Sequence, residues 1–322
     1  MTSLSKMKNP AKFPLLFIPR VALDEAISMM VPFELINFSK ISHRTGKIVK
    51  SLTARKRTYE VFLKIDHRSS VTIYGSKRNW ELASSQDFSK NKAIDTYSCD
   101  YQLQHIKETY EYINRILNFS CRKLYYTIGH FISDHKSMID WLRSQQESVE
   151  KLYIVSLTSY DNDLTYLLSN VKATEHLELS TENTVHFDWV GLLPNNLDLL
   201  HVDAWNCISF EQLLKMNNSN IFLRKSKLTS REINLFLKSW MASESNLNLE
   251  FFQVNIKNDT AMDTILDLPH QEVTYENGKT VENKAGVYQL FGGVEIKQSP
   301  GKTGVMATEM NGDQLFLALF IF

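Results

Sequence analysis

Two glycine-containing motifs have residues that could cradle a phosphate group, but both are incomplete. Residues 301–303 (Gly-Lys-Thr) match the end of a nucleotide-binding loop, which needs an earlier glycine at the position that Ile296 occupies. We therefore expect Pro300 and Gly301 to form a hairpin turn instead. Residues 292–293 (Gly-Gly) lack the later glycine of a dinucleotide-binding fingerprint. The sequence therefore predicts no nucleotide cofactor.

Cys121, His130 and His135 have side chains that bind zinc, but none of their spacings is that of a zinc knuckle. The chain has 3 cysteines, an odd number that fits neither a disulfide framework nor paired knuckles. We therefore expect reduced thiols and hydrogen-bonded or solvated histidines. Neither the serine elbow Gly-x-Ser-x-Gly nor the zinc-protease motif His-Glu-x-x-His occurs. The sequence predicts a protein that binds no metal and is not an enzyme.

Charge is distributed unevenly along the chain, although the formal net charge is +0. Residues 1–78 contain 15 basic and 5 acidic side chains, and the remainder contains 21 basic and 31 acidic ones. The basic run at residues 55–57, with Arg44, Lys47 and Lys50 before it, could contact phosphates, an import receptor or an acidic protein partner. No aromatic side chains interleave with it to stack on bases, so we expect a solvated basic face rather than a nucleic-acid site.

Apolar segments in the sequence are too short to cross a membrane. The longest apolar run, residues 315–322, is far shorter than the ~20 residues that a membrane-spanning helix needs. The first residues also lack the apolar core of a secretory signal. We expect a protein of the cytoplasm or the nucleus that is neither secreted nor inserted in a membrane.

Residues 13–52 predict three short helices after an apolar lead. Pro19 and Pro32 suit the starts of the first two helices, because the first helical residue needs no N–H partner, and Ser42 is placed to cap the third. A segment of about forty residues hardly supports a core of its own. It contains more apolar side chains than such helices can bury, so several should face a partner or the following part of the chain.

The middle of the chain predicts a hairpin followed by a repeated strand–helix pattern. Residues 59–65 and 70–74 alternate apolar and polar side chains, residues 76–98 read as a polar loop, and a helix begins at Leu103. Short β-like segments then recur at steps of 28, 25, 22, 23 and 29 residues, the range of leucine-rich repeats. Their markers are Leu124, Leu152, Leu177, Leu199, Phe222 and Phe251.

Helical patterns fill the gaps between these segments, most clearly at residues 229–242, where Thr229 and Glu232 form a capping box. We expect parallel strands joined by right-handed crossovers, with a closed α/β domain as the alternative. In the tail, turns at residues 277–278 and 299–302 predict a small antiparallel sheet that caps the stack. The predicted fold class is α+β overall. Candidates for the binding face are Tyr125, Tyr153, His201 and Trp205.

Residues 13–52 resemble the F-box of the large nematode F-box family. In that family a Phe-Pro-Leu-Leu lead precedes a Leu-Pro pair, here Ile18-Pro19, and Pro-Phe-Glu-Leu-Ile-Asn opens the second helix, here residues 32–37. Isoleucine in place of leucine at this pair nearly conserves volume. The later chain is similar to the type 2 F-box-associated domain in its terminal strands and at residues 137–148, 210–216 and 228–240.

The resemblance implies an F-box at residues 12–58, a connecting region at 59–120 and a leucine-rich-repeat-like, substrate-binding domain at 121–322. It also implies the substrate-recognition subunit of a ubiquitin ligase, which docks on a Skp-type adaptor and thereby on a cullin, and which holds an unknown target protein. The alternatives are a repeat-type scaffold outside the ubiquitin system and a basic nucleic-acid binder. The positions that match the family's adaptor contact are Pro14, Leu15, Leu16, Ile18, Pro19, Ile27, Met30, Pro32, Phe33, Leu35 and Ile36.

Overall fold

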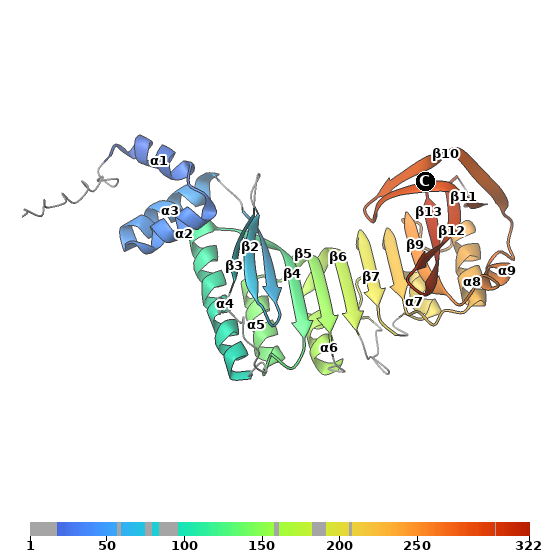
Figure 1. Ribbon diagram of the computed structural model, residues 1–322, viewed down its shortest axis with the longest axis horizontal. Helices are drawn as coiled ribbons and strands as arrows, with labels where there is room; N and C mark the ends of the chain where they lie inside the picture. Colours follow the sequence, from blue (N-terminus) through green and yellow to red (C-terminus); the bar gives the residue numbers. More distant parts are fainter. Residues whose placement is uncertain are drawn as a thin grey trace, which may run out of the picture.

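The computed structural model describes residues 18–56, 59–74, 79–83, 96–157, 161–181, 191–205, 208–299 and 301–322. In these residues, strands form one mixed sheet in the order β10-β11-β12-β13-β9-β8-β7-β6-β5-β4-β1-β2-β3. The molecule is elongated, with the first three helices at one end and the last four strands at the other (Figure 1). A single cluster of buried apolar side chains extends from Leu23 to Ile321 along it.

Three helices occupy the segment in which the prolines predict them. They are α1 (Arg20–Ser28), α2 (Pro32–Lys40) and α3 (His43–Lys56). Pro19 directly precedes α1 and Pro32 is the first residue of α2, where a missing N–H leaves no intrahelical bond unmade. At the start of α3, the backbone N–H of Thr45 donates to the Ser42 hydroxyl at 3.2 Å, as the predicted cap requires.

The predicted hairpin is confirmed as β1 (Glu60–Ile65) and β2 (Ser70–Tyr74), but the loop predicted after it is wrong in part. Residues 79–83 form strand β3 (Asn79–Ala83), which pairs antiparallel with β2 and aligns Trp80 with Ile73. The next helix, α4 (Thr96–Leu117), begins before Leu103. Strand β1 then pairs in parallel with β4 (Ser120–Ile128), so the hairpin lies in the same sheet as everything that follows.

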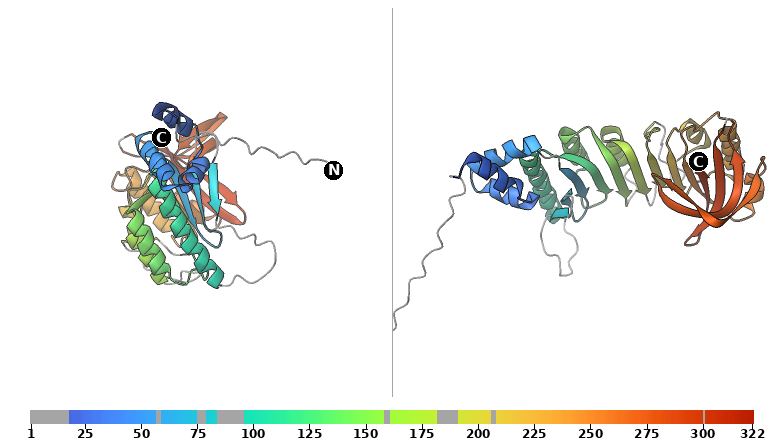
Figure 2. Two further views of the ribbon diagram at one scale, coloured as in Figure 1. Left: turned by 90° about the vertical axis from the view of Figure 1, so that its left-hand side faces the viewer. Right: turned by 90° about the horizontal axis from the view of Figure 1, so that it is seen from above.

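Strands and helices alternate through the middle of the chain, except that no described helix separates β6 from β7, and consecutive strands are parallel neighbours. The remaining elements of this stack are α5 (His135–Gln145), β5 (Ser148–Ser156), α6 (Asp161–Asn170), β6 (Lys172–Thr181), β7 (Leu199–Asp203), α7 (Phe210–Lys215), β8 (Asn220–Arg224), α8 (Ser230–Met241) and β9 (Phe251–Ile256). Sequential parallel strands joined by crossovers of one hand place all these helices on one face of the sheet. The opposite face carries no described helix, as the end-on view shows (Figure 2).

The register corrects three of the six repeat markers. Leu124, Leu152 and Leu177 align with one another and point into the helix-covered core. The chain then continues this buried row through Leu200, Ile221 and Phe252, each one residue away from the predicted markers Leu199, Phe222 and Phe251. Since side chains alternate along a strand, this one-residue shift moves those three markers to the other face.

The tail forms the predicted antiparallel sheet, which continues the stack through pairing of β13 with β9. Its elements are α9 (Ala261–Ile265), β10 (Gln271–Asn283), β11 (Gly286–Lys297), β12 (Thr303–Asn311) and β13 (Gln314–Ile321). The turn predicted at residues 277–278 is wrong, because β10 runs through it and pairs with β11 on both sides of a register shift. Gly278, at φ +70°, supplies the left-handed backbone of that irregularity.

The hairpin turn between β11 and β12 lies at the predicted place. The N–H of Gly301 donates to the carbonyl of Gln298 at 2.8 Å, and Pro300 lies outside the described residues. Strands β10–β13 curve out of the plane of the stack (Figure 2). A second apolar cluster fills the inside of this curve, where Val281 and Leu290 pack with Phe251 and Phe320.

Candidate protein-interaction surfaces

One row of side chains crosses the uncovered side of the sheet, and we call this side of β4–β8 the open face. Tyr125, Tyr153, Glu178, His201 and Phe222 are aligned partner to partner on five neighbouring strands. All five are half-buried, because each strand alternates between the helix-covered core and this face. The row brings three of the predicted binding-face residues together, and the fourth, Trp205, lies 50% exposed after β7.

A chain of ring contacts follows the open face toward the tail. The rings of Tyr153 and His176 lie 5.1 Å apart, and those of His201 and Phe222 lie 5.4 Å apart. Phe222 in turn contacts Phe251 at 4.8 Å, and Tyr288 stacks on Phe251 at 5.3 Å. Aromatic surface of this kind is enriched at protein interfaces, since it buries a large area at low entropic cost.

Glu178 lies between two histidines at the centre of the open face. Its carboxylate oxygens lie 3.9 Å from His176 Nε2 and 3.8 Å from His201 Nδ1, too far for hydrogen bonds. Burial, together with Lys151 beside His176 and Arg224 beside His201, lowers the pKa of each imidazole to about 4. Burial also raises the pKa of Glu178. Both imidazoles are therefore neutral at pH 7, and the carboxylate has no cationic histidine to pair with.

The two histidines also have unused hydrogen-bonding capacity. Among the described residues, Nε2 of His176 and Nε2 of His201 have no hydrogen-bond partner, although both atoms are buried. Polar atoms in such places are normally satisfied by protein or water. Because both nitrogens are buried, the polar contact that this centre offers to a bound polypeptide is the Glu178 carboxylate, whose side chain is 41% exposed. Sequence reasoning missed His176, Glu178 and Phe222, because only the strand register shows that they adjoin Tyr153 and His201.

The open face ends at the curved tail sheet. Lys284, between β10 and β11, pairs with Asp198, just before β7, at 2.6 Å. Both side chains are substantially exposed, so this ion pair contributes little stability and mainly shows where the hairpin lies. The apolar cluster behind it contains Tyr288 together with Phe222 of β8 and Phe251 of β9. A partner on the open face would therefore contact β4–β7, and the β10–β11 hairpin would limit how far it extends toward the tail.

The residues of the predicted adaptor contact differ in how exposed they are in the N-terminal helices. Pro14, Leu15 and Leu16 lie outside the described residues. Pro19 and Phe33 are exposed, and Ile18 and Met30 are half-buried. Ile27, Pro32, Leu35 and Ile36 are buried within the chain itself, so they support the helices rather than offering surface.

Sequence reasoning did not assign three further apolar residues of this region to the adaptor contact. Val21, Met29 and Ile41 are 82%, 73% and 72% exposed, and Phe33 is 49% exposed. We call these four the exposed apolar residues of α1 and α2. Val21 and Met29 belong to the apolar surplus that the sequence shows, but only the packing reveals which members of that surplus stay uncovered. Four exposed large apolar side chains within residues 21–41 make this segment a candidate interaction site.

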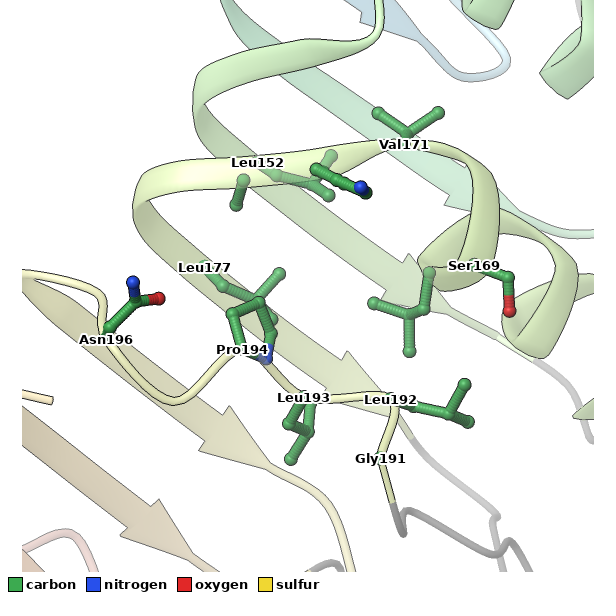
Figure 3. Close-up of a pocket in the computed structure, with 12 residues that line it drawn as sticks. Leu152, Ser169, Val171, Leu177, Gly191, Leu192, Leu193, Pro194 and Asn196 are labelled. Carbon is green, nitrogen blue, oxygen red and sulfur yellow. The ribbon is translucent and has the colours of Figure 1, made fainter. Parts of the chain in front are cut away.

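A pocket of about 370 Å³ lies in the helix layer at the crossover from β6 to β7 (Figure 3). Its walls are mostly apolar and include Val171, Leu192 and Pro194. Residues 182–190, which connect β6 to this wall, lie outside the described part of the chain. The lining combines aliphatic side chains with Ser169, Lys172 and Asn196, and holds no pair of titratable groups suited to catalysis.

The structure keeps the predicted zinc-type side chains apart. Cys121 lies at the start of β4, where burial raises the pKa of its thiol to about 12. His135 lies beyond the other end of β4, and its ring nitrogens contact the Tyr126 hydroxyl at 3.0 Å and the Gly129 carbonyl at 3.1 Å. The described residues contain no cluster of three metal-binding side chains. Nor do those residues contain a helix long and apolar enough to span a membrane.

Comparison with known proteins confirms the resemblance in the later chain. Residues 191–254 match the family described as F-box associated, and they contain β7, α7, β8, α8 and part of β9. The chain is also 24% identical, over 340 aligned residues, to the Skn-1 dependent zygotic transcript 15 protein of Caenorhabditis elegans. That alignment covers 94% of this chain and 92% of the relative. No solved structure matches the chain.

Proposed function

Because the chain carries an F-box-associated segment of the nematode type, we propose that it is the substrate-recognition subunit of a Skp–cullin–F-box ubiquitin ligase. In this proposal α1–α3 form the F-box and dock on a Skp-type adaptor. The leucine-rich-repeat-like stack β4–β9 holds a target protein. The chain itself catalyses nothing, and it accelerates ubiquitin transfer by holding the target near the conjugating enzyme.

The observation that carries the proposal is the set of exposed apolar residues of α1 and α2. Leu23, Ile27, Leu35 and Ile36 already fill the interior of these short helices. Val21, Met29, Phe33 and Ile41 then remain in water, although burying each would release about 1.5–3 kcal/mol. A protein partner of complementary shape recovers that free energy, and large apolar anchors usually dominate such contacts.

Adaptor binding can be tested by co-purification of the full chain with a Skp-type adaptor. We expect Phe33→Ser/Ile41→Ser to reduce adaptor recovery by at least about tenfold, because two anchors are lost at ~1–2 kcal/mol or more each. The predicted contact at Leu16 gives the same expectation for Leu16→Ala/Phe33→Ala. The matched control is Leu235→Ser/Leu247→Ser, since these side chains are 44% and 52% exposed near the other end of the molecule. Unchanged recovery in both test variants would contradict the adaptor contact.

The open face is the surface that we propose for the target protein. Its aromatic row and its central carboxylate offer apolar and polar contacts on one sheet. We expect Tyr153→Ala to deplete proteins that accumulate on the full chain when proteasome activity is blocked. Tyr166→Ala is the control, because Tyr166 lies on the helix layer and its hydroxyl donates to Asp140 at 2.6 Å. Equal target recovery from both variants would assign the target to another surface.

A further inference from the structure

A groove of about 690 Å³ separates α2 and the first turns of α3 from α4, and none of the four exposed apolar residues assigned to the adaptor contact lines it. This volume lies within the ~300–1,000 Å³ that ligand sites commonly occupy. All the ionisable side chains that line it, apart from the Tyr112 phenol, are basic. The cations around it are Lys40, His43, Lys47, Lys50 and Arg115, where the histidine counts only when protonated, and no acidic residue lines it.

The cations of the groove have no acidic partners among the described residues. Lys40, Lys47, Lys50 and Arg115 form no ion pair there. The sequence of α3 contains no acidic residue at all. Positive charge therefore gathers on neighbouring elements without the compensation that surface lysines and arginines usually find.

The nearest carboxylates on α4 are used elsewhere. Glu111 precedes Arg115 by one helical turn, a spacing at which the two side chains could pair. Its carboxylate instead accepts a hydrogen bond from Trp141 Nε1 at 2.8 Å. Glu108 accepts from the Gln104 amide at 3.0 Å. The fold thus turns these two acidic groups of α4 away from the groove and leaves Arg115 without a charge partner.

Tyr112 orders the floor of the groove. Its hydroxyl lies 2.8 Å from the hydroxyl of Ser39, which is itself buried. Lys40 Nζ lies 5.3 Å from the centre of the Tyr112 ring, and the Arg115 guanidinium lies 5.2 Å from it. Cation–π contacts of this length hold both cations at the groove wall and restrict their rotamers. Two long side chains are therefore partly positioned before any ligand arrives.

We propose that this groove binds an acidic peptide segment of a partner protein. Three lysines and an arginine can each form a charge-assisted hydrogen bond to a carboxylate, and the Ser42 hydroxyl lies beside them. The groove spans three helices, so it matches an extended run of carboxylates better than a single small anion. The N-terminus of α3 opens onto it and adds to its positive potential.

The same observations disfavour a nucleic acid as the occupant. Single strands bind through aromatic side chains on which bases stack. Tyr112 is the aromatic side chain of this groove, and its ring is already in contact with two cations. A duplex would need a broad basic surface, whereas these cations line a groove between helices.

The test is a fluorescence-anisotropy titration of the full chain with a fluorescein-labelled octaglutamate peptide at roughly 0.15 M salt. We expect Lys47→Glu/Lys50→Glu to weaken binding by at least about tenfold, because two attractive charges become repulsive. Both side chains are exposed, so the variant keeps its fold, which thermal unfolding verifies. Lys47→Gln/Lys50→Gln should also weaken octaglutamate binding, but by a smaller factor, because it removes the two charges without reversing them.

The matched control is Lys227→Glu/Lys257→Glu, which makes the same change of charge at exposed lysines near the tail. We expect it to change octaglutamate binding by less than about twofold. An equal loss in the control would overturn the proposal, since attraction would then depend on net charge alone. The chain could instead bind a twelve-nucleotide oligothymidylate more tightly than octaglutamate. If Lys47→Glu/Lys50→Glu abolished that binding, the acidic-peptide proposal would be overturned in favour of a nucleic acid. Neither result depends on adaptor binding.

Discussion

Two neutral histidines at the centre of the open face make the molecule sensitive to acid. The ordinary imidazole pKa is 6.5, and in the fold the pKa of His176 and of His201 falls to about 4. Between these values the unfolded chain binds protons that the folded chain does not. The stabilisation is therefore complete above pH 6.5 and is lost as the pH falls toward 4. Glu178 acts in the opposite sense, since its raised pKa favours the protonated carboxyl in the fold.

We expect the free energy of unfolding of the wild type to fall between pH 7.5 and pH 5 by about 2–4 kcal/mol more than that of His176→Gln/His201→Gln. The estimate follows from ~1.4 kcal/mol for each tenfold change in a protonation equilibrium, applied to two side chains that are less than a fifth exposed. Denaturant unfolding at the two pH values measures it. The control is His105→Gln, which makes the same substitution at an exposed position of α4 away from the open face. Equal acid sensitivity in the double variant and the wild type would show that other groups cause it.

At the scale of the residue, sequence reasoning identifies the open face only in part. Tyr125, Tyr153 and His201 could be named as candidates, because each is an aromatic or polar residue next to a leucine of the repeated strand pattern. Glu178 cannot, since its importance comes from two histidines on its own and a neighbouring strand. The adaptor residues show the same limit. Composition reveals an apolar surplus, but only packing decides that Leu35 is buried and Ile41 is exposed.

At the scale of the element, prediction is strongest where local chemistry decides the outcome. The capping box of α8 forms as its residues require: the N–H of Glu232 donates to the Thr229 hydroxyl at 3.2 Å, and the N–H of Thr229 donates to the Glu232 carboxylate at 2.7 Å. The apolar side chains Ile233, Phe236, Leu237 and Trp240 of this helix recur at steps of three and four residues and are all buried. The capping box and the apolar stripe both involve only residues of α8 and its N-cap, so they can be predicted without knowing what the helix packs against.

We expect Thr229→Ala to lower the free energy of unfolding by about 1 kcal/mol, because it leaves a backbone N–H of the first turn of α8 without its acceptor. Equilibrium unfolding in urea measures the change. Ser230→Ala is the matched control, since Ser230 is the next residue and is not the cap. If both substitutions cost the same, the hydrogen bond contributes nothing specific and the capping explanation is wrong.

Elements that depend on a distant partner are the ones that sequence reasoning misses. Strand β3 is short and lies in a polar stretch, so its existence depends on the free edge that β2 offers it. In β10, the Asn-Gly pair has turn chemistry, but β11 continues alongside and the left-handed glycine serves a bulge instead. The one-residue shift of the markers in β7–β9 has the same origin, since register is a property of paired strands.

At the scale of the whole molecule, the sheet is continuous from the first hairpin to the last strand. The predicted boundary near residue 120 separates α4 from β4, yet β4 pairs directly with β1. Helix α4 also covers this junction: Tyr110 meets the rings of Phe119 and Trp141 edge to face at 5.0 and 5.4 Å. Helices α1–α3 are joined to the rest of the molecule in another way. Among the described residues, α2 and α3 pack mainly against α4 and not against the sheet.

This arrangement predicts different fates for two truncated chains. Residues 119–322 would lose the strand beside β4 and the buried stripe of α4, which contains Leu103, Ile106, Tyr110, Ile113 and Leu117. Five such side chains contribute about 1.5–3 kcal/mol each, a sum comparable with the ~5–15 kcal/mol that stabilises a whole protein. The bare β4 edge would also pair with other chains. We expect this fragment to aggregate in size-exclusion chromatography and to lack a cooperative thermal transition.

Residues 59–322 keep the β1–β4 pairing and the cover of α4, so they serve as the control truncation. Removing α1–α3 uncovers α4 only where those helices touch it, as at Ile116, whose carbonyl accepts a hydrogen bond from the Thr53 hydroxyl at 2.6 Å. We expect this fragment to elute free of aggregates and to unfold in one transition at a somewhat lower temperature than the full chain. A monodisperse, cooperatively unfolding 119–322 fragment would contradict the continuity argument, because the stack would then be stable without its first strands.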